Sequence, residues 1–334
     1  MKLPALFLVS LTITVAALVT LDSSAESAAR VSNPCLVTTT REPIKPIPAE
    51  LNLDQRKVAL GEQLFNEAKL SHDDSMSCAT CHDLKHGGID ARMHPTTAAG
   101  QMGGTVNTPT VFNCAFNFRQ FWDGRAVTLE EQVDGPVLNP SEMASAWPEV
   151  LSKLRAVPTY VAAFRAIYGG DIQPAQVRNA LAEFERSLST PNSKFDQYLR
   201  GREDAISAEE KEGYRKFKSY GCASCHQGVN VGGNMFEQLG AVADYYSDRS
   251  ATQTDMGRFN VTHNEEDRHV FKVPGLRNVA LTAPYFHDGS AKTLEDAVDV
   301  MGQYQLGRKL SSKDIEQITS FLRTLTGEYQ GTPL

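Results

Sequence analysis

The stretch "SMSCATCHDLKHGG" (residues 75–88) contains two cysteines and a histidine in the order Cys-x-x-Cys-His, and "YGCASCHQGV" (residues 220–229) repeats that order. Covalent c-type haem uses all three residues, because two thioethers hold the porphyrin and the histidine ligates the iron. A tetrahedral zinc site would need four ligands, and a redox dithiol has no need of the histidine. We therefore predict two haems, bound by Cys78, Cys81, His82, Cys222, Cys225 and His226.

The N-terminus predicts export. Residues 3–21 are almost wholly apolar behind Lys2, and small residues follow, which is typical of a signal peptide over residues 1–25. An uncleaved membrane anchor is the alternative, since about 18 apolar residues can span a bilayer. The formal net charge of −7 gives no electrostatic reason to bind nucleic acid. We expect an exported protein whose partners are small proteins or uncharged solutes.

The remaining chain predicts two mainly α domains, one around each haem motif. The proline-rich residues 26–52 are expected to form an extended lead-in, and residues 190–204 to join domains at 53–195 and 205–327. A Gly-x-x-x-Phe pattern precedes each motif, at Gly61–Phe65 and Gly213–Phe217. Helical stripes are expected at three places: Leu60, Leu64 and Ala68; Val177, Leu181, Phe184 and Leu188; and Ile315, Ile318, Phe321, Leu322 and Leu325, ended by Gly327.

Two capping boxes mark helix starts in the second half. Ser207 and Glu210 form one, and Thr293 and Asp296 form the other. The second box places Met301 on the same helix face as three apolar residues, which favours a methionine that points inward. The residues on that face are Leu294, Ala297, Val298 and Met301.

Nearly the whole mature chain, from about residue 51 to 327, resembles the bacterial dihaem cytochrome c peroxidases. The resemblance rests on "NTPTVFNCAFNFRQFWDGRA" (107–126), "LEEQVDGPVLNPSEM" (129–143), "VPGLRNVALTAPYFHDGS" (273–290) and "TLEDAVDVMG" (293–302). It implies two cytochrome c-like domains in a periplasmic homodimer. It further implies reduction of hydrogen peroxide to water at the N-terminal haem, with electrons from a small cytochrome c or blue copper protein received at the C-terminal haem.

The resemblance also implies roles for individual residues. Met301 matches the distal ligand of the second haem, opposite His226, and Trp122 matches a tryptophan between the haems that can relay an electron. Gln132, Pro136 and Glu142 match the residues that line the peroxide face of the first haem. A carboxylate such as Glu142 can take a proton from one peroxide oxygen and give it to the other.

A calcium site and a structural histidine are implied in the same way. Asn107 and the backbone carbonyls of Thr282 and Pro284 match a calcium site between the domains, and all-oxygen ligation suits that ion. His287 matches a position with a structural role between the haems.

Several alternatives stay open. A pure electron-transfer cytochrome would need both irons six-coordinate, and the related enzyme that matures methylamine dehydrogenase uses tyrosine where this chain has Met301. Either Cys35 and Cys114 form a disulfide, or Cys114 is a buried free thiol. Many family members hold a histidine over the first haem, but the matching position here is Ala99. We therefore expect that iron to be open to peroxide in the oxidised protein, with His94 as the alternative ligand.

Overall fold

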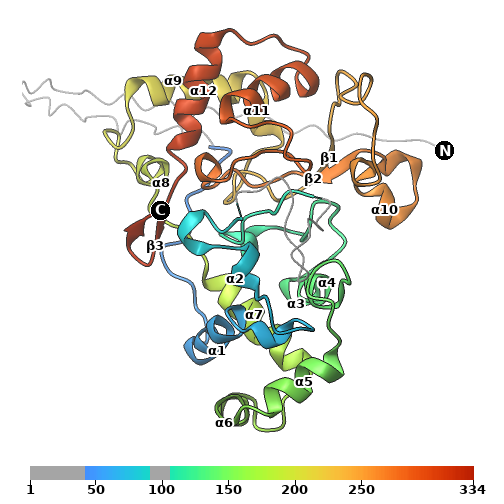
Figure 1. Cartoon of the computed structure of the whole chain (residues 1–334). Helices are drawn as coiled ribbons and strands as arrows, with labels where there is room; N and C mark the ends of the chain where they lie inside the picture. The colour runs from blue at the N-terminus through green and yellow to red at the C-terminus, as the bar shows by residue number, and fades with distance from the viewer. Residues whose placement is uncertain (1–41, 91–105) are drawn as a thin grey trace, which may run out of the picture. The chain divides into compact units, whose positions relative to one another are not determined.

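The computed structural model describes residues 42–90 and 106–334. The predicted signal peptide, Cys35 and His94 lie outside the described residues. The fold is mainly α, as predicted, and the strands are short (Figure 1). The helices of the first half are α1 (Gln55–Phe65), α2 (Cys78–Cys81), α3 (Leu129–Gln132), α4 (Asp134–Leu138), α5 (Trp147–Arg155), α6 (Pro158–Tyr168) and α7 (Pro174–Ser187).

The second half is also helical and has two small sheets. Its helices are α8 (Lys194–Leu199), α9 (Ala208–Ser219), α10 (Phe259–Thr262), α11 (Leu294–Val300) and α12 (Ser312–Arg323). Strand β1 (Phe236–Gln238) pairs antiparallel with β2 (Val270–Lys272), and β3 (Glu328–Tyr329) pairs antiparallel with β4 (Thr332–Pro333).

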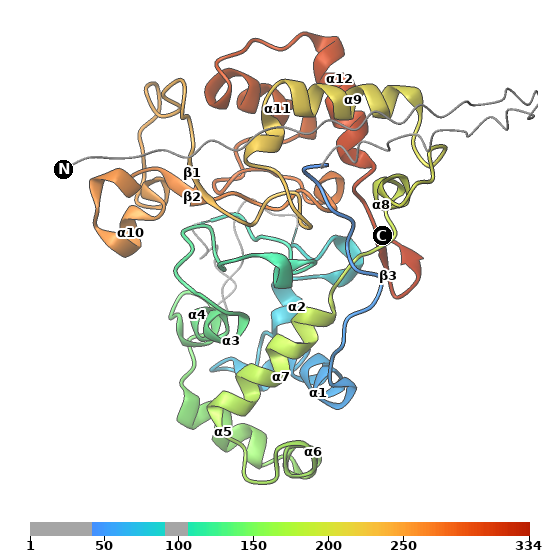
Figure 2. The same ribbon diagram turned by 180° about the vertical axis from the view of Figure 1, so that it is seen from behind.

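In the first half, α1 packs against α7, and the two helices lie side by side in both views (Figures 1 and 2). Gly61 makes this approach possible, because a Cβ atom there would lie 2.0 Å from the carbonyl oxygen of Ala180. One turn later, the rings of Phe65 and Phe184 meet with their centroids 5.2 Å apart. Leu60 and Leu64 are buried in the same core, as the helical spacing predicted. Ala68, the third residue of the predicted stripe, lies beyond the end of α1 and begins a separate 3₁₀ turn.

The second half repeats this arrangement with α9 and α12. A Cβ atom at Gly213 would lie 1.9 Å from the carbonyl oxygen of Gln317, and the rings of Phe217 and Phe321 lie 5.2 Å apart. The Gly-x-x-x-Phe repeat therefore has a structural cause. In each half, the glycine lets two helix backbones touch and the phenylalanine fills the core beside that contact.

Helix α12 ends at Arg323, so the prediction that Gly327 ends it is wrong by one turn. The backbone N–H of Leu325 bonds to the carbonyl of Leu322 after the helix, and Leu325 still points into the core. Gly327 instead lies against the carbonyl oxygen of Thr190, where a Cβ atom would be 2.0 Å away. Its role is a close backbone contact rather than a helix cap.

A buried ion pair fastens the segment between the two halves. The guanidinium of Arg277 lies 2.8 Å from the carboxylate of Asp196 on α8, and both side chains are completely buried. Arg277 also donates to the carbonyls of Lys45 and Val229. Phe195, beside Asp196, packs with the core of the second half. The segment predicted as a joint therefore contributes helix α8 to the C-terminal core.

Replacing Gly213 by alanine is expected to destabilise the protein by about 1–3 kcal/mol, because the added methyl group must separate two helix backbones. Urea unfolding followed by far-UV circular dichroism measures the effect. Gly170→Ala is the matched control, since nothing lies within 4 Å of a Cβ atom placed there. Equal stability of the Gly213 variant and the wild type would contradict the close packing of α9 on α12.

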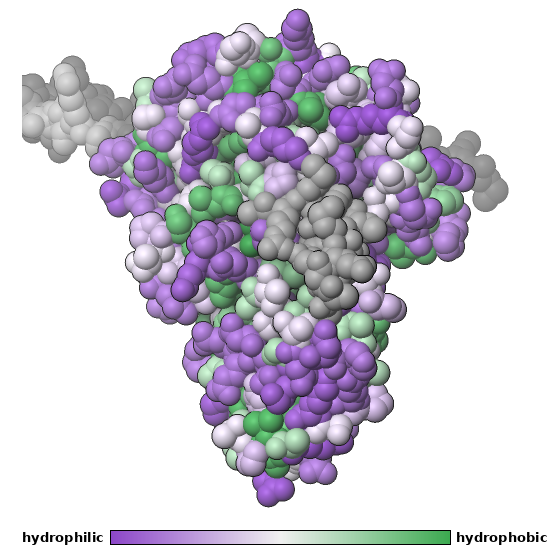
Figure 3. All heavy atoms as spheres, in the orientation of Figure 1, coloured by the Kyte–Doolittle hydropathy of each residue, from purple (hydrophilic) through white to green (hydrophobic). Residues whose placement is uncertain are grey.

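Hydrophilic side chains predominate on the face in Figure 3, and apolar ones form small separate spots between them. No helix within residues 42–90 and 106–334 is long and apolar enough to cross a membrane.

Candidate functional site: two haem-binding motifs and the residues around them

The first Cys-x-x-Cys-His motif forms the short helix α2. The backbone N–H of Ser77 donates to the Thr80 hydroxyl at 3.0 Å, which closes the first turn, and His82 follows the last helical residue. Nδ1 of His82 lies 3.2 Å from the carbonyl oxygen of Gly88. Burial lowers the pKa of His82, so the imidazole is neutral. Because Nδ1–H is held by a carbonyl, Nε2 keeps its lone pair for a metal.

The second motif has the same construction. Cys222–Ser224 form a 3₁₀ turn, and Nδ1 of His226 lies 3.3 Å from the carbonyl oxygen of Val231. Burial lowers the pKa of His226 to about 4, which again leaves a neutral ring with Nε2 available. The two predicted proximal histidines therefore have the tautomer and protonation state that iron ligation requires.

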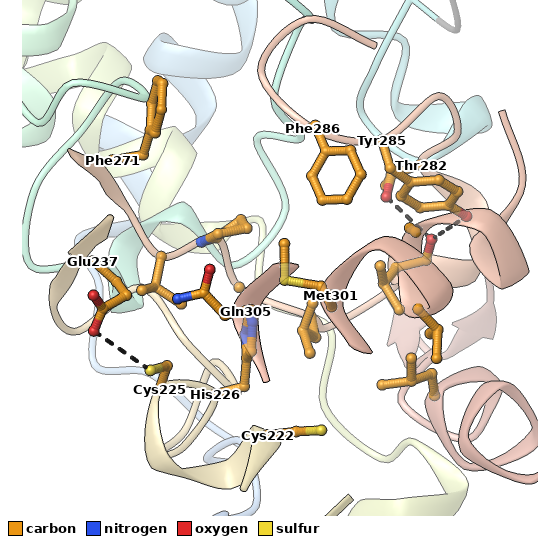
Figure 4. A pocket seen from close by; sticks show the side chains of 18 of the residues that line it. Cys222, Cys225, His226, Glu237, Phe271, Thr282, Tyr285, Phe286, Met301 and Gln305 are labelled. Carbon is orange, nitrogen blue, oxygen red and sulfur yellow. Dashed lines mark hydrogen bonds between the residues drawn. The ribbon is translucent and has the colours of Figure 1, made fainter. Parts of the chain in front are cut away.

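A cavity of about 260 Å³ opens in front of the second motif. Cys222, Cys225, His226 and Met301 all line it, and Figure 4 shows the Met301 thioether and the His226 imidazole facing the same space. Met301 follows the capped helix α11 and begins a π-helical turn, Met301–Gln305. Such turns are rare in proteins as a whole, and those that occur often lie at functional sites, since the extra residue redirects side chains. Two thiols, an imidazole and a thioether around one apolar cavity fit a covalent haem with His/Met ligation.

Both predicted capping boxes are confirmed. The backbone N–H of Asp296 donates to the Thr293 hydroxyl at 3.1 Å, and the N–H of Glu210 donates to the Ser207 hydroxyl at 3.2 Å. The box of Thr293 and Asp296 fixes the start of α11, the helix that leads to Met301 at the cavity.

Trp122 lines the same cavity and is fixed at two points. Its indole Nε1–H donates to the carbonyl oxygen of Asn107 at 2.9 Å, and its own carbonyl accepts from the backbone N–H of Lys272 at 2.8 Å. His287 lies next to it, with ring centroids 6.4 Å apart. Nε2 of His287 forms a hydrogen bond to the carboxylate oxygen Oδ1 of Asp255 at 2.7 Å.

Glu142 follows α4 in a tight turn and is partly buried. Burial raises its pKa, while the Asn139 amide, which donates to its Oε1 at 2.8 Å, and the charge of Arg125 oppose that increase. Gln132 ends the neighbouring helix α3, and Pro136 lies within α4. A carboxyl whose pKa is raised by partial burial is suited to proton transfer.

Sequence reasoning missed Arg125, Asn139 and Phe121 in this region. The Arg125 guanidinium lies 3.5 Å from the centre of the Phe121 ring and pairs with Asp123 at 2.8 Å. The Phe121 ring in turn packs on Gly135, where a Cβ atom would lie 2.5 Å from it. The spacing within "QFWDGR" could have signalled the Asp123–Arg125 pair. The effect of the Arg125 charge on the pKa of Glu142 arises only in the tertiary structure, so the sequence could not predict it.

Two of the predicted calcium ligands, Asn107 and the carbonyl of Pro284, lie side by side. The Asn107 amide nitrogen donates to the carbonyl of Pro284 at 2.6 Å and to that of Phe286 at 3.0 Å. The Thr282 hydroxyl donates to the carbonyl of Val279. A calcium ion would require the Asn107 amide to turn so that its oxygen, and not its nitrogen, faces the carbonyls.

Cys114 is buried at the start of a 3₁₀ turn, and its Sγ lies 3.9 Å from the carbonyl oxygen of Glu185. Burial raises the pKa of this thiol well above its ordinary value, and it raises the pKa of the Glu185 carboxyl to about 8. The predicted pairing with Cys35 concerns a residue outside the described part of the chain.

Known proteins of one family are similar to this chain. A family model described as di-haem cytochrome c peroxidase matches residues 55–204. The chain is 43% identical to cytochrome c551 peroxidase of Nitrosomonas europaea, over 87% of this chain and 86% of that protein. This chain belongs to the di-haem cytochrome c peroxidase family. The resemblance identified from the sequence motifs is therefore confirmed.

Other members of the family cover the chain to different extents. The cytochrome c peroxidase Ccp of Escherichia coli is 48% identical over 86% of this chain, which spans 62% of that relative's length. The methylamine utilization protein MauG of Methylorubrum extorquens is 32% identical, over 85% of this chain and 82% of that protein. A crystal structure of a MauG-like protein associated with microbial copper homeostasis shares the fold. Its TM-score is 0.74 at 25% identity, over 88% of this chain and 95% of that one.

Proposed function

We propose that this family member is a periplasmic peroxidase that reduces hydrogen peroxide to water with two electrons from a small cytochrome c or blue copper protein. The observation that carries the proposal is the asymmetry of the two halves. The second motif faces a cavity lined by Met301, and a thioether there suits electron transfer. The first half offers a partly buried carboxyl, Glu142, with a raised pKa, which suits proton transfer.

The division of labour follows from this asymmetry. When bound, the two haems supply iron that binds peroxide in the first half and stores electrons in the second. Glu142 accepts a proton from the peroxide oxygen that remains and returns it to the oxygen that leaves as water, and Gln132 orients the substrate. Trp122, held by two hydrogen bonds in the wall of the second motif's cavity, would relay an electron between the two haems. Two electrons and two protons convert one peroxide to two waters.

Met301 separates this proposal from its nearest competitor. A dihaem oxidase of the type that matures methylamine dehydrogenase carries tyrosine at this position, whereas here a thioether faces His226 across the cavity. A neutral sulfur ligand favours the reduced iron and raises the potential. The MauG relatives are compatible with a common ancestor, but Met301 favours peroxidase chemistry.

Calcium, a homodimer and export to the periplasm are further parts of the proposal. The partners of Asn107 support a cation site at the junction of the two halves once the amide turns, since Pro284 and Phe286 offer carbonyl oxygens there. The homodimer and the periplasmic location rest on the family resemblance and the apolar N-terminus.

Steady-state assay of the holoprotein tests the function. Peroxide is expected to oxidise a reduced small cytochrome c or cupredoxin only in the presence of the protein, with two donor molecules consumed per peroxide. Failure of both the oxidised and the half-reduced protein to turn over would favour a plain electron-transfer cytochrome.

A stopped-flow mixture of the fully ferric protein with peroxide tests the state of the first haem. A prompt change of the Soret band supports an open first iron. Reaction only after one-electron reduction would support His94 as a ligand instead.

A further inference from the structure

Asp255 is a buried carboxylate that is bonded to a residue of the cavity wall. It is 8% exposed, and its Oδ1 lies 2.7 Å from Nε2 of His287, which is 2% exposed. Its Oδ2 accepts from the backbone N–H and the hydroxyl of Thr252, both at 2.6 Å. Burial alone would raise the pKa of Asp255, but the hydrogen bonds from Thr252 and His287 outweigh it and lower the pKa. Asp255 is therefore ionised, and Nε2 of His287 carries the proton that it donates.

The bond to Asp255 fixes the ring of His287 within the wall of the second motif's cavity. Among the described residues, those that line the cavity include His287, Trp122 and Phe271 but not Asp255. The imidazole stacks on the ring of Phe271, with a centroid distance of 4.4 Å and an interplanar angle of 27°. It meets the Trp122 ring edge to face, at 6.4 Å and 70°. The carboxylate behind His287 therefore determines how the imidazole lies against Trp122.

The hydrogen bond of the Trp122 indole leads back to the same histidine. Nε1–H of Trp122 donates to the carbonyl oxygen of Asn107 at 2.9 Å, and the backbone N–H of Asn107 donates to the carbonyl oxygen of His287 at 2.7 Å. The indole is thus held against His287 directly, through the ring contact, and indirectly, through Asn107. Because Asp255 anchors His287, it supports both contacts.

We propose that Asp255 is a positioning residue for electron transfer between the haems and acts through His287 on Trp122. It holds the indole in place, and its negative charge makes the indole easier to oxidise. The inference rests on the proposed function, in which Trp122 relays electrons between the two haems. Asp255 itself takes no part in the reaction with peroxide.

The relay moves one electron at a time. The indole of Trp122 loses an electron toward the first haem and regains one from the ferrous second haem, so that it ends unchanged. Its Nε1 keeps the proton throughout, because the carbonyl of Asn107 can accept a hydrogen bond but cannot take up a proton. The indole therefore carries a positive charge between the two transfers. The carboxylate of Asp255, on the other side of the imidazole bond, stabilises that charge.

Single-turnover kinetics test the proposal. Half-reduced holoprotein, with the second haem ferrous, is mixed with peroxide, and the loss of the ferrous α-band gives the rate of electron transfer between the haems. Asp255→Asn keeps the size of the side chain but removes its charge. It is expected to lower this rate about tenfold, the effect of one nearby charge at an effective dielectric constant of about 20.

A double-mutant cycle shows whether Asp255 acts through the indole. Trp122→Phe removes the relay, and adding Asp255→Asn to it is expected to change the remaining rate by less than about twofold. Asp288→Asn is the matched control, because an oxygen of that carboxylate also lies within 4.8 Å of a ring nitrogen of His287. Asp288 is paired with Arg249 at 3.6 Å and is partly exposed. Its removal is therefore expected to change the rate by less than about threefold.

Ultraviolet resonance Raman spectroscopy gives a readout that does not need peroxide. The indole band that reports N–H hydrogen bonding is assigned to Trp122 by its loss in Trp122→Phe. It is expected to shift in Asp255→Asn, because the contacts that hold the indole are loosened. Trp147, whose Nε1–H donates to Asp134 at 2.9 Å, is the internal reference and should not shift.

A second variant keeps the test open if Asp255→Asn does not hold two haems per chain. Thr252→Val removes one hydrogen bond from the carboxylate and keeps its charge. It is expected to shift the Trp122 band in the same direction, with a smaller loss of rate.

A rate in Asp255→Asn equal to that of the wild type, together with an unshifted Trp122 band, would overturn the proposal. The same loss of rate in the Trp122→Phe background would also overturn it, since Asp255 would then act without the indole. Peroxide turnover by the native protein is measured separately and depends on neither outcome. Failure of this inference is therefore distinguishable from failure of the proposed function.

Discussion

Glutamine in place of Glu142 is expected to lower peroxide turnover by about 10²–10⁴-fold, with both haems still bound. Glutamine has the size of glutamate and can still accept the hydrogen bond from Asn139, which in the native protein is 2.8 Å long. It cannot take a proton from peroxide. The measurement is the steady-state kcat with a reduced small cytochrome as donor, together with absorption spectra that verify unchanged haem ligation.

The pH dependence gives a sharper version of this test. Burial raises the pKa of Glu142, and the Asn139 hydrogen bond and the charge of Arg125 lower it. A carboxylate base is active above its pKa, so activity is expected to fall as the pH decreases through a value above the usual glutamate range. Asn139→Ala removes one group that lowers the pKa of Glu142. The fall in activity on the acidic side, the acid limb, should therefore move to higher pH. In Glu142→Gln the limb should be absent.

Glu131→Gln is the matched control, because Glu131 is an exposed acidic residue of the neighbouring helix α3 whose bond to the N–H of Val127 glutamine can keep. It should leave both kcat and the acid limb unchanged. Turnover of Glu142→Gln within tenfold of the wild type would exclude Glu142 as the proton-transfer group.

The second large effect concerns stability. Removing Arg277, as in Arg277→Met, is expected to cost about 3–5 kcal/mol of the free energy of unfolding. The reason is that Asp196, whose side chain is 0% exposed, would keep its charge without its partner 2.8 Å away. The carbonyls of Lys45 and Val229 would also lose their donor. Urea unfolding of the holoprotein measures the loss.

A double-mutant cycle separates the ion pair from the other contacts of Arg277. Asp196→Asn keeps an acceptor for the N–H of Ile47 but removes the charge. The double variant Arg277→Met/Asp196→Asn is therefore expected to be more stable than the sum of the single effects predicts. Strict additivity would show that the two charges do not interact in the folded protein.

What the sequence determined by itself is local or covalent. Haem attachment needs Cys-x-x-Cys-His within five consecutive residues, and a capping box needs two residues three apart, so both patterns can be read without a fold. Amphipathic spacing likewise predicted α1, α7 and α12, and the capping box at Ser207 and Glu210 predicted α9. Where it erred, at the end of α12, the cause was a glycine required by a contact with Thr190 rather than by the helix.

What only the tertiary structure decided is which groups share a buried environment. Asp196 and Arg277 are far apart in sequence yet form the buried pair, and the contacts of Gly61 and Gly213 come from helices at the other end of each half. Nothing in the sequence distinguishes the buried Lys272 from a solvated lysine, because its burial depends on the segments that pack around it. Desolvation and charge pairing depend on distances in space, and those distances are set when the helices pack.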